Sequence, residues 1–176
     1  MNPIFEQDVF FEQLVKVRFT PARIAATLVT YGIATTLTVV LWLTAVYMNF
    51  APLAFLATVA IYWMAWNSAG QYKVEYEYAV TNGEFDIDRI INKRKRKRAV
   101  TFQVKEVQRL KKYQKGEPVP EGVAKRVYAC TPDENTYSLL VRTKTDGLTY
   151  IIFSPDEHIR SAMKRYLPRD LATQFD

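Results

Sequence analysis

The hydropathy pattern is dominated by one long segment without charged residues. No Asp, Glu, Lys or Arg occurs between Arg23 and Lys73. About 20 helical residues cross a bilayer core, and a single helix over this segment would reach roughly 70 Å at about 1.5 Å per residue. The segment is therefore predicted to fold back as a hairpin of two transmembrane helices, near residues 24–48 and 51–69.

The residues at the ends of this segment favour a hairpin. Thr20–Pro21 suits a helix start, Asn49 can end the first helix, and Pro52 fits the first turn of the second helix. The alternative is a helical hairpin buried in a soluble core. That arrangement would need amphipathic elements around it, whereas the rest of the chain has the pattern of strands.

Basic residues flank the predicted hairpin on both sides. Lys16, Arg18 and Arg23 precede the first helix, Lys73 follows the second, and the connecting turn carries no charge. Positively charged flanks tend to stay on the cytoplasmic side of a membrane. We therefore expect a multi-pass protein of the cell membrane with both termini in the cytoplasm.

Residues 1–20 are predicted to form an amphipathic helix. Asn2 and Pro3 suit a helix start. Apolar residues then recur at helical spacing, at Phe10, Phe11, Leu14 and Val15. Such a helix would lie in the membrane interface or pack on the cytoplasmic domain, and the sequence favours neither position over the other.

From residue 71 the pattern changes to alternation of apolar and polar residues. In "YKVEYEYAV", apolar and aromatic residues share one face of a strand. Asn82–Gly83 follows, and this pair is a strong hairpin signal because a type I′ turn needs positive φ at both central positions. Further strands are predicted near Arg98–Val104, Arg126–Cys130, Tyr137–Arg142 and Leu148–Phe153.

The stretch "SPDEHIRSAMKRYLP" predicts one C-terminal helix. Ser154 is the expected N-cap, Glu157 closes a capping box, and Pro168 stops the helix, which leaves residues 169–176 as a tail. The predicted fold class is α+β: a transmembrane helical hairpin, then an antiparallel β-sheet or partly open barrel of about six or seven strands, with one C-terminal helix. The cytoplasmic domain would cover residues 71–168.

This order of elements, with the stretches "FFEQLVKV" and "EYEYAVTNGEFDIDRIINKRKRKR", resembles an uncharacterised family of small Gram-positive bacterial membrane proteins. Proteins of that family carry two transmembrane helices and a pleckstrin-homology-like cytoplasmic domain, and the resemblance spans nearly the whole chain. In eukaryotic relatives of the fold, a basic loop between the first two strands binds phosphoinositides. The tight Asn82–Gly83 turn leaves no room for such a pocket here.

The composition has an excess of basic residues and few of the cysteine and histidine residues that catalysis or metal binding often needs. The net charge is +6, which favours an acidic partner such as anionic lipid or nucleic acid. Cys130 is the single cysteine, so no intrachain disulfide can form, and it is expected in the core. His158 is expected at the surface. Since the sequence has no Gly-rich phosphate loop or nucleophile motif, we predict no catalytic, cofactor or metal site.

The candidate contact site is the basic run of Lys93, Arg94, Lys95, Arg96, Lys97 and Arg98. Two strands of similar length on either side of Asn82–Gly83 would return this run to the membrane surface, where it could contact anionic phospholipid. Alternatively, the run neutralises acids on the outer hairpin face, which are Glu75, Glu77, Glu84, Asp86 and Asp88. Nucleic acid is the least favoured partner because no aromatic residues interrupt the run.

These patterns together predict a function in binding rather than catalysis. The protein is expected to be a membrane-anchored, non-enzymatic adaptor that engages an unknown protein partner at the inner membrane surface. An anionic-lipid headgroup sensor and an accessory subunit of a transporter or envelope complex are the alternatives.

Overall fold

The structure is a computed structural model that describes residues 10–18 and 20–175. The chain divides into two compact units. The helical unit comprises Arg18–Val74 and Ile91–Arg94, and the sheet unit comprises the described residues up to Val17, then Glu75–Ile90 and the residues from Lys95 onward. In sequence, the helical unit is therefore an insertion within the sheet unit. It also includes Ile91–Arg94, a turn from later in the chain.

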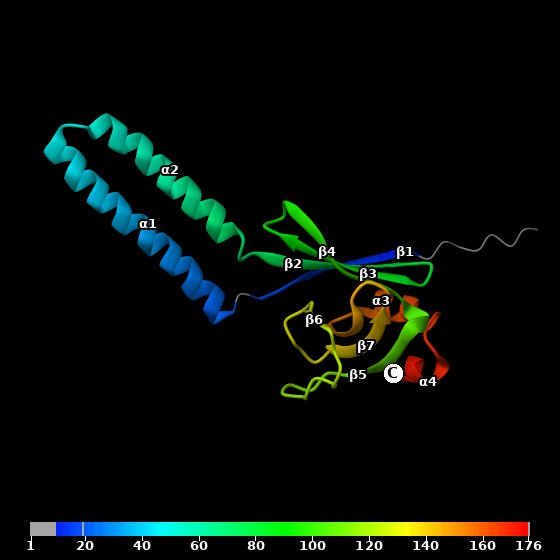
Figure 1. Ribbon diagram of the computed structural model, residues 1–176. Helices are drawn as coiled ribbons and strands as arrows, with labels where there is room; N and C mark the ends of the chain where they lie inside the picture. Colours follow the sequence, from blue (N-terminus) through cyan, green and yellow to red (C-terminus); the bar gives the residue numbers. More distant parts are fainter. Residues whose placement is uncertain (1–9, 19, 176) are drawn as a thin grey trace, which may run out of the picture. The chain divides into compact units, whose positions relative to one another are not determined.

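Two antiparallel helices form most of the helical unit (Figure 1). Helix α1 (Pro21–Met48) begins at Thr20, whose side chain accepts a hydrogen bond from the Arg23 amide. It ends at Asn49, which adopts a left-handed conformation with φ 64°. Helix α2 (Ala51–Gly70) has Pro52 in its first turn. The predicted helix starts and the predicted reversal are therefore confirmed.

Small side chains lie where the two helices meet. Ala34, Ala45, Ala54 and Ala65 are buried, while most of the large apolar residues of both helices are exposed. Two polar contacts join the helices: the Trp42 indole donates to Thr58 Oγ1 at 3.1 Å, and the hydroxyls of Thr35 and Tyr62 lie 3.2 Å apart.

The prediction of two transmembrane helices is supported for one of them. Among the described helices, α1 alone is long and apolar enough to cross a bilayer, judged by length and composition. Helix α2 has 20 residues, but its second half contains Tyr62, Trp63, Trp66, Asn67 and Ser68, which are less hydrophobic than aliphatic residues.

The predicted N-terminal amphipathic helix is wrong for its second half. Residues Phe10–Lys16 form strand β1, which pairs antiparallel with β2 (Val74–Thr81), with Phe10 opposite Thr81 and Lys16 opposite Glu75. Alternate residues of β1 face the core, where Phe11 and Val15 pack. The spacing of the apolar residues fits a helix or a strand, and pairing with β2 decides in favour of the strand. Asn2 and Pro3 lie outside the described residues.

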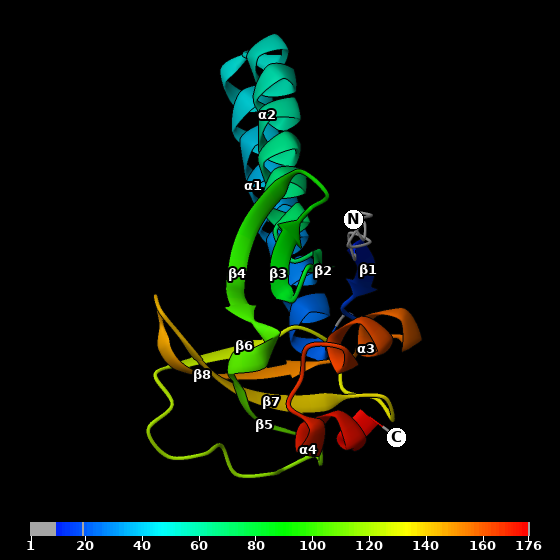
Figure 2. The ribbon, with the colours of Figure 1, turned by 90° about the vertical axis from the view of Figure 1, so that its right-hand side faces the viewer.

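The sheet unit contains two four-stranded sheets. The first has the order β1-β2-β3-β4, with β3 at Glu84–Ile91 and β4 at Lys95–Gln103. The second has the order β5-β7-β8-β6 (Figure 2). Its strands are β5 (Val107–Lys112), β6 (Lys125–Tyr128), β7 (Tyr137–Thr143) and β8 (Gly147–Phe153), and the short 3₁₀ helix η1 (Val104–Glu106) precedes β5.

The observed sheets correct the predicted one. The described residues form eight strands instead of six or seven, because β1 and β5 were not anticipated. Strand β6 runs parallel to β8, whereas all strands were predicted to be antiparallel. The predicted turn between β2 and β3 is confirmed, since Asn82 and Gly83 both have positive φ, 49° and 85°.

The C-terminal region also differs from its prediction. Helix α3 (Glu157–Lys164) is capped by Asp156, whose Oδ1 accepts a hydrogen bond from the Ile159 amide at 2.8 Å. The expected cap, Ser154, instead donates to the Asp133 carboxylate at 3.1 Å. Residues beyond Pro168 are not a free tail: α4 (Arg169–Ala172) and the 3₁₀ helix η2 (Thr173–Phe175) follow, and the ring of Phe175 packs edge-on against Tyr137.

The larger of two hydrophobic clusters lies between the two sheets and α3. Tyr78, Phe85 and Phe153 pack ring against ring at its centre, with centroids about 6 Å apart. The buried Tyr78 hydroxyl donates to the Ala129 carbonyl at 2.9 Å, which links the first sheet to the segment after β6. Burial raises the pKa of this phenol, so it stays protonated.

Candidate functional site

The predicted basic site is divided between the two units of the structure. Lys93 and Arg94 lie in the turn between β3 and β4, which belongs to the helical unit. Lys95, Arg96, Lys97 and Arg98 form the first half of β4 in the sheet unit. All six side chains are exposed, but their neighbours differ.

The turn is held against the end of α2. Asn92 and Lys93 both have positive φ, 52° and 54°, a conformation that asparagine tolerates well. The Asn92 amide donates to the Lys73 carbonyl at 2.8 Å. At Gly70 a Cβ atom would lie 2.3 Å from Asn92 Nδ2. Glycine at this position therefore allows the Asn92 side chain to approach the helix.

Arg94 lies over an aromatic ring of the same unit. Its guanidinium carbon is 5.2 Å from the ring centroid of Trp66, one turn before the end of α2. This distance is within the range of a cation–π interaction. The contact keeps the Arg94 charge beside the helix end.

All charged residues of the helical unit are cations. They are Arg18, Arg23, Lys73, Lys93 and Arg94, and the unit contains no Asp or Glu. Because α1 and α2 are antiparallel, the start of α1 and the end of α2 lie at the same end of the unit. The unit therefore has a basic end, formed by these five residues, and an uncharged end at the α1–α2 turn.

The two arginines of β4 bind carboxylates of β3, the adjacent strand, and of β2, the next strand in the sheet. Arg96 forms ion pairs with Glu77 and Asp88. Arg98 contacts Asp86 at 2.6 Å and Asp88 at 2.5 Å. Thr101 adds a hydrogen bond to Asp86 at 2.6 Å. These contacts match the interpretation in which the run neutralises the acidic hairpin face.

Asp88 is the most buried member of this network, with 8% of its surface exposed. Burial alone would lower the pKa of Arg98, but its hydrogen bond to Asp88 and the negative charges of Asp86, Asp88 and Glu84 raise it. Lys95 and Lys97 form no ion pair with any of the residues that the structure describes. The basic run thus contains two arginines that form ion pairs with carboxylates, and four cations that form none with the described residues.

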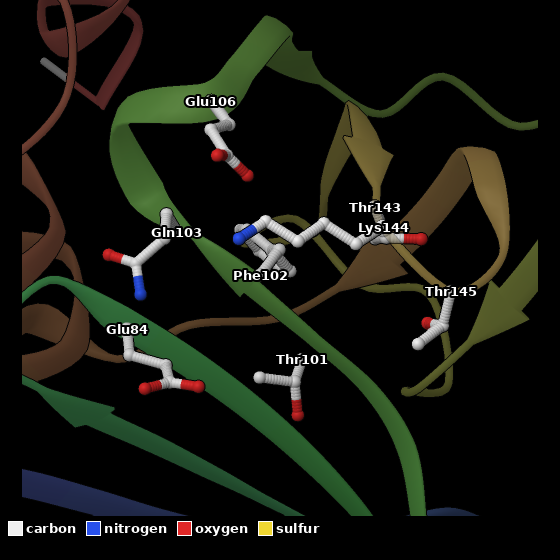
Figure 3. Close-up of a pocket in the computed structure, with 8 residues that line it drawn as sticks. All are labelled: Glu84, Thr101, Phe102, Gln103, Glu106, Thr143, Lys144 and Thr145. Atoms are coloured by element: carbon white, nitrogen blue, oxygen red, sulfur yellow. The ribbon is translucent and has the colours of Figure 1, made fainter.

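A shallow pocket lies elsewhere in the sheet unit, and the sequence did not indicate it. It has a volume of about 240 Å³ and is lined by residues of β3, β4, η1 and the β7–β8 turn (Figure 3). Lys144 extends across it toward Gln103, and the Glu106 carboxylate points toward the same space. Because these residues are far apart in sequence, no local motif marks the pocket.

The two residues with potential for metal or nucleophilic chemistry, Cys130 and His158, have different surroundings. Cys130 is buried, and burial raises its pKa to about 11, which disfavours the reactive thiolate. His158 is exposed and stacks on Phe11 with ring centroids 6.0 Å apart. Within residues 10–18 and 20–175, no three His, Cys, Asp or Glu residues are grouped so that they could hold a metal ion.

Comparison with known proteins places the chain by its fold. No curated protein and no solved structure matches it. A family described as a bacterial PH-like domain (DUF6106) matches residues 7–173, a range that includes the inserted helices as well as both sheets. The fold class is accordingly α+β with a PH-like domain, as the sequence predicted. The chain belongs to this bacterial PH-like domain family.

Proposed function

We propose that this protein is a membrane-anchored, non-enzymatic adaptor. The helical hairpin would span the cell membrane with both termini in the cytoplasm, and the PH-like sheet unit would engage a protein partner at the inner surface. The observation that carries this proposal is the composition of the helical unit, which exposes apolar side chains along its helices and has charges at one end only.

The exposed surface of the hairpin suits lipid. Its larger exposed residues include Leu28, Val29, Ile33, Leu37, Leu43, Val46, Leu53, Phe55, Leu56 and Val59. In water each of these side chains would lose the roughly 1.5–3 kcal/mol that burial of a large apolar side chain provides. In a bilayer the same surface is solvated by acyl chains, and the small residues between the helices allow close packing.

The charged residues of the helical unit all lie at its basic end, and this supports an orientation for both helices. A Lys or Arg at the centre of a spanning helix costs roughly 2.5–3.5 kcal/mol, so the basic end would remain outside the bilayer core. The positive-inside rule then assigns the basic end to the cytoplasm. The four points at which the chain passes between the two units all lie at this end of the helical unit, so the PH-like domain would be cytoplasmic.

The adaptor role follows from anchoring a recognition scaffold at the membrane surface. It is tested by co-purification of the full chain in mild detergent, followed by determination of mass and stoichiometry. We expect a protein partner in a fixed ratio. A monomer that purifies without partner from its native cells under several mild detergents would contradict the adaptor role. Recovery in the soluble fraction without detergent would contradict the anchor.

A further inference from the structure

We infer that the basic end of the helical unit holds the phosphate group of an anionic phospholipid, with Lys73, Lys93 and Arg94 as its contacts beside Trp66. This inference rests on the proposed insertion of α1 and α2 into the membrane. It assigns lipid contact to the turn between β3 and β4 and not to the β4 half of the basic run.

The turn cations are available to an anion, unlike the β4 arginines. None of Lys73, Lys93 and Arg94 forms an ion pair within the described part of the chain, and their own unit contains no carboxylate. The N–H groups of a guanidinium lie in its own plane, so the position of Arg94 over the Trp66 ring leaves N–H groups free to point away from the ring. Arginine in this arrangement can bind two phosphate oxygens at once.

The turn geometry brings the backbones of the residues that carry the cations close together before any ligand binds. The 2.8 Å hydrogen bond from the Asn92 amide to the Lys73 carbonyl fixes the turn to the residue that carries the first cation. The close approach at Gly70 and the contact of Arg94 with Trp66 fix it from two further sides. A site that is already ordered loses less conformational entropy on binding.

Trp66 indicates the depth of this site and the source of the phosphate. Tryptophan concentrates at the level of the lipid headgroups. Trp66 is 51% exposed and lies four residues before the end of α2. A cation stacked on this ring would therefore lie at the level of the lipid phosphates. The neighbouring Trp63, which is 63% exposed, would face acyl chains and not water.

A purely structural role for these cations is the competing explanation. Positive charges near the end of α2 also favour its negative helix terminus. That effect would stabilise the protein equally in the presence of any lipid. Selective retention of anionic lipid therefore separates the two explanations.

The test measures lipids retained by the full-length protein in neutral detergent, with native mass spectrometry as the readout. Phosphatidylglycerol and phosphatidylcholine of equal chain length are the two probes. We expect phosphatidylglycerol to be retained at least about tenfold more tightly. The double variant Lys93→Gln/Arg94→Gln should lose this preference. The matched control Lys95→Gln/Lys97→Gln removes the same charge from the same run and should keep it.

Three results would overturn the inference. Equal loss of preference in both double variants would show diffuse attraction to charge, and equal retention of the two lipids by the unchanged protein would show no headgroup site. Displacement of phosphatidylglycerol by millimolar glycerol phosphate would show a site for a soluble anion. Should the double variant fold poorly, Arg94→Lys is the second test. It keeps the charge but removes the guanidinium that lies over Trp66, so the retention of phosphatidylglycerol should weaken.

These results are distinguishable from failure of the proposed anchor. If the helices do not insert, the unchanged protein will not co-sediment with neutral vesicles after reconstitution, whatever its lipid preference. If they insert but the headgroup site is absent, the protein will co-sediment with neutral and acidic vesicles and retain both lipids alike.

Discussion

Arginine and lysine alternate in the basic strand β4, and the two residue types have different surroundings. Arg96 and Arg98 reach the carboxylates of β2 and β3, whereas Lys95 and Lys97 reach no carboxylate among the described residues. Arginine suits the positions near these carboxylates because its planar guanidinium can contact two carboxylates at once, as Arg98 does with Asp86 and Asp88. A run of uniform charge in the sequence is thus divided by the two-residue period of a strand.

The first residue-scale prediction concerns this division. Arg98→Gln should lower the free energy of unfolding by about 1–3 kcal/mol, because the nearly buried Asp88 would lose its closer charged partner and keep only Arg96, at 3.8 Å. Lys97→Gln should change it by less than about 0.5 kcal/mol, as expected for an exposed side chain. Denaturant unfolding in detergent, followed by circular dichroism of the sheet unit, measures both. Equal effects would refute the division of the run.

The second residue-scale prediction concerns Cys130. With its pKa raised to about 11 by burial, about 0.1% of the thiol would be ionised at pH 8. Ellman's reagent should therefore react with the folded protein at least about a hundredfold more slowly than with the unfolded chain. Rapid reaction of the folded protein would show that the segment after β6 opens readily.

At the scale of elements, β1 determines how the helices are joined to the domain. It lies before the helical insertion in sequence, yet pairs with β2 after the insertion along its whole length. The Gln13 side chain connects β1 to the start of α3: its Nε2 donates to the Ser154 carbonyl at 3.0 Å, and its Oε1 accepts from the Asp156 amide at 2.9 Å. The strand is therefore an integral part of the sheet unit.

Gln13→Ala tests this placement of β1. The change would leave two partly buried backbone groups without partners, so unfolding should become easier by about 1–3 kcal/mol. Glu12→Ala, on the exposed face of the same strand, is the matched control and should change stability by less than about 0.5 kcal/mol. If both variants had the stability of the unchanged protein, β1 would not be anchored to α3 as described.

Elements with local signals could be predicted from the sequence, and elements defined by distant contacts could not. The Asn82–Gly83 turn and the ends of α1 depend on neighbouring residues, and both were predicted correctly. Strand β1 was mistaken for a helix because its partner strand lies more than 50 residues away. The parallel pairing of β6 with β8 depends equally on distant residues.

The same distinction applies to the candidate site. The sequence identified all six cations and the acids opposite them, because both form obvious clusters. It could not show that Arg94 stacks on Trp66 or that Asn92 approaches Gly70, since these contacts join segments more than 20 residues apart. The division of the run into a turn part and a strand part therefore came from the structure.

At the scale of the whole molecule, the helical unit is inserted between two paired strands of one sheet. The chain enters and leaves the helices through β1 and β2, whose pairing closes the insertion. The family match covers residues 7–173, so it includes this insertion as well as both sheets. This connection would fix both ends of the proposed anchor to the domain.

The most direct test of the proposed anchor is cysteine accessibility in intact spheroplasts, with Cys130→Ser as the background. One cysteine replaces Phe50, beside the α1–α2 turn, and another, in a separate variant, replaces Asp146 in the β7–β8 turn. A membrane-impermeant maleimide should label position 50 in intact spheroplasts, and position 146 only after permeabilisation. Labelling of position 146 from outside, or protection of position 50 until permeabilisation, would contradict a hairpin that crosses the membrane with a cytoplasmic PH-like domain.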